Sequence, residues 1–195
     1  MNDAAPMGVP AIRPGALLVA RPELQDANFR RTVVYIVAHG QDGTWGVVLN
    51  RPTETPVHNV IPQWAPSTSK SQVVFLGGPV QPAGAMSLAV CLPGHSPAHQ
   101  LSMAQISGPV GLLDLDTDPE PIAPFLRGIR IFAGHAGWGE GQLEDEIAEG
   151  SWDLLTGLPD DILAGPKVDL WFQVLRRQPF PLTWQAYHPG ELIRN

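Results

Sequence analysis

The sequence predicts a single α+β domain built on a mixed β-sheet and flanked by short helices. With 195 residues, the chain is long enough for one domain with a large core. Apolar residues make up 44% of it and charged residues 16%, against roughly 25% charged in a typical globular protein. Strand-like and helix-like segments also follow one another without the regular alternation of a doubly wound fold. We therefore expect one domain over residues 15–195, preceded by a flexible N-terminal tail at residues 1–14.

Apolar and β-branched runs predict the strands. Residues 15–22 form a short apolar run that ends at Pro22. The runs at 32–40 and 44–50 are separated by a short loop that contains glycine, so they predict a β-hairpin. Further strands are expected at 71–80, 85–94, 110–116, 129–135 and 151–157.

Helical periodicity and helix-ending residues predict the helices. Residues 141–150 place Leu143 and Ile147 four apart, and Gly150 supplies a C-terminal stop. Residues 167–177 are the clearest amphipathic segment, with two arginines in the last turn. Short helices are also expected within 51–64, 118–128 and 159–165, whereas 95–108 is expected to be irregular.

Composition and charge limit the classes of function. The formal net charge of −7 does not supply the basic surface on which most nucleic-acid-binding proteins depend, which argues against direct DNA binding. One cysteine excludes an intrachain disulfide and fits a reducing compartment. The first residues lack a secretory signal pattern, and no apolar run approaches the roughly 18 residues of a transmembrane helix. We therefore expect a cytoplasmic protein with no membrane partner.

The stretch AGHAGWGEGQLEDEI, residues 133–147, is the most distinctive in the chain. Glycines before a helix could present backbone N–H groups to a phosphate. However, Glu140, Glu144, Asp145 and Glu146 would repel an anion, and no Lys, Ser or Thr stands at the phosphate-loop spacing. A tight turn from strand to helix, with glycine at positive φ, is the favoured interpretation.

The sequence carries no strong metal or nucleophile motif. Neither an HExxH pattern nor paired cysteines occur, which leaves open only a site made by His39, His135 and a carboxylate. There is no G-x-S-x-G motif, and Cys91 lies in an apolar strand where burial should raise its pKa and lower its reactivity. We expect no metal, no cofactor and no catalytic residue set.

Asn50 and Arg51 end a predicted strand just before Pro52. An Asn–Arg pair at a strand end could bind a carboxylate, or it could tie two loops together. The tie is the favoured interpretation, and Pro52 disfavours helix at Arg51 in either case.

Five segments occur in a recognisable order: GALLVARPEL, FRRTVVYIVAH, GVVLNRP, FLGGPV and AGHAGWGEGQLEDEI. In this the chain resembles the AlgH/YqgE family of bacterial proteins from about residue 15 to its C-terminus. The resemblance implies a cytoplasmic protein with a bifurcated sheet and a small barrel. It also implies a regulatory role, since one member is described as acting on transcription. One departure is that the family usually has Tyr where this chain has His135, which argues against an essential family role for that histidine.

These observations lead to one hypothesis and one alternative. The hypothesis is a non-enzymatic regulatory or binding protein that recognises a protein or small molecule in a cleft. The alternative is an enzyme of unknown reaction that uses the same cleft, with His39 as its base. The residues expected to line the cleft are Asn50, Arg51, Trp138, Gln142, Glu144 and His39.

Overall fold

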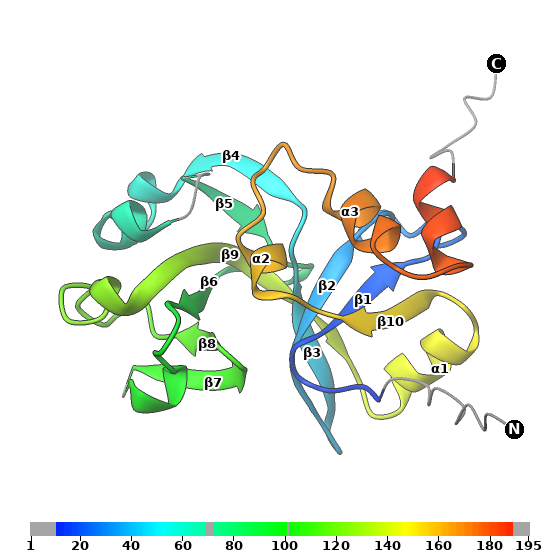
Figure 1. The fold of residues 1–195 in the computed structure, drawn as a ribbon, viewed down its shortest axis with the longest axis horizontal. Helices are drawn as coiled ribbons and strands as arrows, with labels where there is room; N and C mark the ends of the chain where they lie inside the picture. The colour runs from blue at the N-terminus through cyan, green and yellow to red at the C-terminus, as the bar shows by residue number, and fades with distance from the viewer. Residues whose placement is uncertain (1–10, 69–71, 101, 189–195) are drawn as a thin grey trace, which may run out of the picture.

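The computed structural model describes residues 11–68, 72–100 and 102–188, which form one α+β domain (Figure 1). A ten-stranded sheet runs through it in the order β10-β1-β2-β3-β9-β6-β8-β7, with β5 beside β9 and β4 beside β5. All pairings are antiparallel except that of β5 with β9, so the sheet is mixed, as predicted. The strands are β1 Ala16–Ala20, β2 Val33–Gly40, β3 Gly43–Val48, β4 Pro52–Pro56, β5 Val73–Leu76, β6 Val80–Cys91, β7 Met103–Ser107, β8 Val110–Leu113, β9 Leu126–Trp138 and β10 Trp152–Thr156.

The helices are short and lie at the ends and on the faces of the sheet. The α-helices are α1 Gln142–Ala148, α2 Pro159–Ile162 and α3 Leu170–Arg176. The 3-10 helices are η1 Val57–Asn59, η2 Pro62–Ser67, η3 Pro97–His99, η4 Ala123–Phe125 and η5 Leu182–Tyr187. Within the described part of the chain, no helix is long and apolar enough to cross a membrane.

Strand β9 joins the two halves of the sheet. Its last residues pair with β3, where Thr44 faces Trp138, and its earlier residues pair with β6 and β5. Gly134 has a φ of +71°, and a Cβ there would lie 2.5 Å from the carbonyl oxygen of Gly78, so glycine is needed at this position. The sheet curls at this strand into an open half-barrel (Figure 1). The bifurcation and the small barrel that the resemblance implies stay predictions.

Three apolar clusters hold the layers together. Helix α3 packs Trp171 and Leu175 on one face of β1 and β2. Helix α1 places Leu143 on the opposite face, among Trp138 and Trp152. The third cluster lies around Trp64, between η2 and the strands β6 and β9. Each of these side chains except Trp138 is 2% exposed or less, so they are among the most deeply buried side chains of the core.

Several predicted elements are confirmed and others need correction. The hairpin of β2 and β3 has His39 opposite Thr44, and α1 and α3 lie within their predicted ranges. The predicted helix at 51–64 is wrong in part, because its first residues form β4, an exposed edge strand where prolines are tolerated. The range 95–108 contains η3 and the edge strand β7 rather than irregular chain. The range 118–128 holds only a turn of 3-10 helix before β9 begins.

Candidate functional site

His39 and Glu144, two of the predicted cleft residues, lie close together near the turn of the β2–β3 hairpin. The Nδ1 atom of His39 is 2.7 Å from the hydroxyl of Thr44, its partner across the hairpin. The Nε2 atom of His39 lies 3.8 Å from a carboxylate oxygen of Glu144 on α1. The imidazole therefore stands between a buried hydroxyl and a half-exposed carboxylate.

Trp138 and Gln142 share an acceptor that the sequence analysis did not single out. The carboxylate of Glu146 accepts hydrogen bonds from the indole N–H groups of Trp138 and Trp152, each at 2.9 Å. Its other oxygen accepts one from the side-chain amide of Gln142, also at 2.9 Å. The Gln142 carbonyl oxygen in turn accepts a bond from the backbone N–H of Gly139. These contacts fix the turn between β9 and α1, and Gly141 has the positive φ, +72°, expected of such a turn.

Asn50 links two segments of the chain by hydrogen bonds, which is the interpretation that the sequence favoured. Its amide nitrogen donates to the carbonyl of Arg31 at 2.8 Å, and its amide oxygen accepts from the N–H of Val33 at 3.0 Å. Arg51 donates to the carbonyl of Arg30 at 2.9 Å. Both side chains therefore hold the chain that enters β2 to the chain that leaves β3.

The six predicted residues form three groups of contacts. His39 pairs with Glu144, Trp138 and Gln142 meet at Glu146, and Asn50 and Arg51 bind the backbone that precedes β2. Two hollows in the described surface lie elsewhere, one on α3 and one beside β7 and β8. A ligand cleft shared by all six residues stays a proposal.

Within residues 11–68, 72–100 and 102–188 there is no group of three or more His, Cys, Asp or Glu side chains that could hold a metal ion. The ring of His135 packs edge-on against Trp45, with 5.7 Å between ring centroids, and its buried Nδ1 atom forms no hydrogen bond with any residue that the structure describes. Cys91 is 3% exposed, and burial raises the pKa of its thiol, as predicted.

A second surface, formed by η5 and α3, carries exposed aromatic side chains that were not predicted from the sequence. Phe180, Trp184 and Tyr187, at η5 and just before it, are 70%, 71% and 64% exposed. Phe180 and Trp184 meet edge-on at 5.4 Å, and Tyr187 meets Phe172 of α3 at 5.6 Å. We call the set Phe172, Arg176, Phe180, Trp184 and Tyr187 the aromatic–arginine surface.

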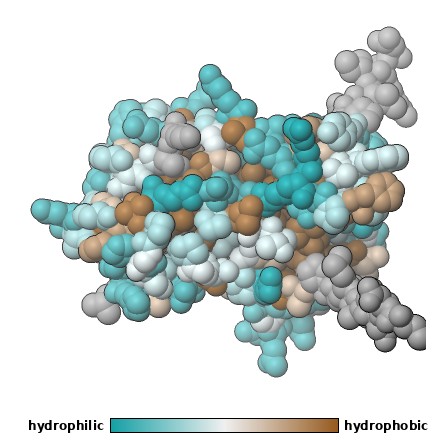
Figure 2. Space-filling model, viewed as in Figure 1, coloured by the Kyte–Doolittle hydropathy of each residue, from teal (hydrophilic) through white to brown (hydrophobic). Residues whose placement is uncertain are grey.

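A hollow of about 400 Å³ adjoins this surface on α3. Its lining residues are Asp169, Phe172, Gln173, Arg176 and Arg177. Figure 2 shows patches of hydrophobic residues between hydrophilic ones across the face that includes α3.

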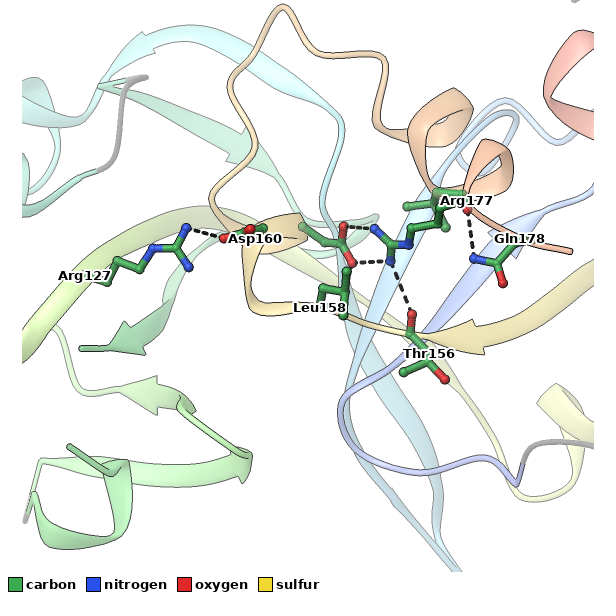
Figure 3. Close-up of polar contacts among 8 residues, drawn as sticks. Arg127, Thr156, Leu158, Asp160, Arg177 and Gln178 are labelled. Carbon is green, nitrogen blue, oxygen red and sulfur yellow. Dashed lines mark hydrogen bonds and ion pairs between the residues drawn. The ribbon is translucent and has the colours of Figure 1, made fainter. Parts of the chain in front are cut away.

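The charges around the hollow differ in how they are compensated. Asp169 is paired with Arg31, and Arg177 forms a two-pronged pair with the buried carboxylate of Asp161 (Figure 3). Arg176 has no carboxylate partner within the described residues, and its guanidinium lies 5.9 Å from the ring centroid of Phe172. The hollow therefore has one uncompensated positive charge beside exposed aromatic rings.

Comparison with known proteins identifies the family. A profile described as AlgH-like matches residues 17–183. A UPF0301 protein of Mycolicibacterium vanbaalenii is 49% identical over 184 residues, which cover 94% of this chain and 92% of the relative. A UPF0301 protein of Mycobacterium tuberculosis is 50% identical over 184 residues, with 94% and 91% covered.

Two solved structures share the fold. A crystal structure of a protein from Corynebacterium diphtheriae has a TM-score of 0.89 and 37% identity, with 92% of this chain and 94% of that chain covered. The solution structure of the AlgH protein from Pseudomonas aeruginosa, also described as UPF0301, has a TM-score of 0.63 and 25% identity, with 98% and 100% covered.

Proposed function

This chain belongs to the AlgH-like family, and we propose that it acts by binding another protein through its aromatic–arginine surface. The observation that carries the proposal is the exposure of three large aromatic side chains, each 64–71%, on one short segment. Contiguous exposed apolar patches on soluble proteins mark interaction sites. Trp, Tyr and Arg are also the residues that contribute most binding energy at protein interfaces.

The energy available from this surface is large enough for a stable complex. An aromatic side chain buries about 150–250 Å² when it is fully covered. At about 25 cal/mol per Å², covering the exposed part of Trp184 alone would contribute roughly 3–4 kcal/mol. The edge-on contacts with Phe172 and Phe180 hold the rings in place before binding, which reduces the entropy lost.

The chemistry of the surface defines the partner. The guanidinium of Arg176 would bind a carboxylate of the partner, and the aromatic rings around it would bind an apolar side chain next to that carboxylate. A single-stranded nucleic acid could also stack on the rings. The net charge of −7 favours a protein, because nucleic acid would be repelled by the rest of the surface.

A regulatory role is consistent with this mode of action. Regulation of transcription, which the resemblance implies for one relative, would then be indirect, through a protein that itself contacts DNA. The lack of a basic motif in the sequence supports indirect rather than direct action on DNA. The single cysteine fits a reducing compartment, which supports a cytoplasmic site of action.

The test is site-specific photo-crosslinking in cells, with the crosslinking residue in place of Trp184. The same residue in place of Val60, which is 49% exposed on another part of the molecule, is the control. We expect one discrete protein adduct from position 184 and none from position 60. Equal adducts from both positions, adducts with nucleic acid, or adducts only with a second copy of this chain would each contradict the proposal.

A second candidate is an enzyme that uses His39, and the contacts of Thr44 and Glu144 with its ring favour it. A hydroxyl, an imidazole and a carboxylate in series resemble the arrangement that activates a nucleophile. Hydrolysis of activated esters should then be lost in both His39→Gln and Thr44→Val, and retained in His58→Gln, which removes an exposed histidine. Equal hydrolysis by all three variants would eliminate this candidate.

A further inference from the structure

Arg130, in the middle of β9, is a buried cation without a buried counter-ion. The residue is 2% exposed, and its guanidinium carbon lies 3.8 Å from the ring centroid of Phe75. One terminal nitrogen, Nη2, donates to the carbonyl of Ala164, while the other, Nη1, is buried and has no hydrogen-bond partner among the described residues. Burial lowers the pKa of Arg130 to about 10, so the group still carries its charge at neutral pH.

The acids that follow β10 do not compensate this charge. Asp160 pairs with Arg127 (Figure 3), Asp161 pairs with Arg177, and Arg130 forms no ion pair within the described residues. An unpaired buried charge is costly, and a group left with an unsatisfied N–H adds to that cost. An anion that binds this group in the folded state, and not in the unfolded chain, adds to the stability of the fold.

Helix α2 and the following residues 163–168 cover Arg130, and on one side a weak ion pair joins α2 to β9. Helix α2 is a single turn, and the ion pair that fastens it to β9 joins two exposed side chains, Arg127 and Asp160. Exposed pairs of this kind contribute about 0–1 kcal/mol. The other side is firmly held, because Ile162 is fully buried and Asp161 is paired with Arg177. Movement of residues 163–168 would uncover the guanidinium without unfolding α2.

We propose that Arg130 binds the carboxylate of a short-chain monocarboxylic acid, which enters beneath residues 163–168. The free Nη1 supplies one donor, and release of the Ala164 carbonyl frees Nη2 for a two-pronged contact with the carboxylate. Phe75 and Leu88, which is opposite Arg130 in the register of β6 and β9, give the site an apolar wall for a short alkyl chain. A singly charged ligand fits because a second negative charge would be buried there without a partner.

Thermal unfolding in the presence of a series of sodium salts tests the site. Butyrate and hexanoate should raise the melting temperature of the wild type and of Arg13→Met, a matched change on an exposed arginine that precedes β1. The two salts should leave the melting temperature of Arg130→Met unchanged. Phosphate and sulfate stabilise folded proteins generally because they are excluded from the protein surface, so they should raise the melting temperatures of the wild type and of Arg130→Met equally. Equal shifts in Arg130→Met and wild type, or no shift in either, would overturn the proposal.

A second measurement covers the case in which Arg130→Met does not fold. In ¹⁵N-labelled wild-type protein, titration with hexanoate should move the side-chain Nε–H resonance of Arg130 in a saturable way. The corresponding resonance of Arg127 should not move. A linear drift of both resonances with concentration would contradict a site at Arg130, whatever the behaviour of the variant.

Discussion

Replacement of Glu146 by alanine should destabilise the domain strongly, although the residue is one of several acids on α1. Its carboxylate accepts the indole N–H groups of Trp138 and Trp152, which are 5% and 1% exposed. Each indole left without an acceptor loses roughly 1–3 kcal/mol, so the two together should lower the free energy of unfolding by about 2–6 kcal/mol. Glu146→Gln should lose about 1–2 kcal/mol, since the amide oxygen can still accept from the indoles but its NH₂ group faces the amide nitrogen of Gln142.

The assay is urea unfolding followed by far-ultraviolet circular dichroism, because tryptophan fluorescence would respond to the local change itself. The matched control is Glu149→Ala, which removes an exposed acid at the end of the same helix. That control should change stability by less than about 0.5 kcal/mol, as surface substitutions do. If Glu146→Ala is no more destabilising than Glu149→Ala, the carboxylate does not hold the two tryptophans together and our interpretation of this turn is wrong.

Four further single substitutions and one double variant test other contacts by the same assay. Leu143→Ala should cost about 2–5 kcal/mol because the side chain is fully buried, whereas Gln142→Ala, at an exposed position, should cost about 1 kcal/mol, and equal losses would contradict the assignment. Asn50→Ala should cost about 2 kcal/mol, since it removes two hydrogen bonds to the backbone, and a neutral result would show that the tie is dispensable. Arg177→Met should cost about 3–5 kcal/mol because it strands the buried carboxylate of Asp161, and Asp161→Asn in the same background should recover part of the loss.

Local signals in the sequence were sufficient for elements whose pattern is local. The β2–β3 hairpin follows from two apolar runs around a glycine loop, and α1 follows from Leu143, Ile147 and the stop at Gly150. A strand at 129–135 was predicted, but its extension to Leu126–Trp138 and its pairing with both β3 and β6 were not, because these depend on residues far away in the chain. Strand β4 was missed because prolines are rare in strands except at an open edge, and the edge is a property of the whole sheet.

In the candidate site, too, a contact with a local sequence signal was predicted, whereas features that depend on tertiary structure were not. The tie at Asn50 was favoured from its place between a strand and Pro52, and the contacts confirm it. Glu146 was overlooked because a run of acids at the start of a helix is typical of a solvated face, and nothing local reveals two indoles behind it. The aromatic–arginine surface was overlooked because aromatic residues are usually buried, whereas Trp184 is 71% exposed. The dense aromatic and arginine content of residues 171–187 was the signal that could have pointed to it.

The affinity of the partner captured at position 184 tests the central claim most directly. Isothermal titration of that purified partner should show a loss of about 30-fold in Trp184→Ala, the equivalent of roughly 2 kcal/mol for a residue at the centre of an interface. Val60→Ala, which truncates an exposed apolar side chain elsewhere, should change the affinity by less than about twofold. Equal affinities of wild type, Trp184→Ala and Val60→Ala would contradict the claim that this protein works through its aromatic–arginine surface.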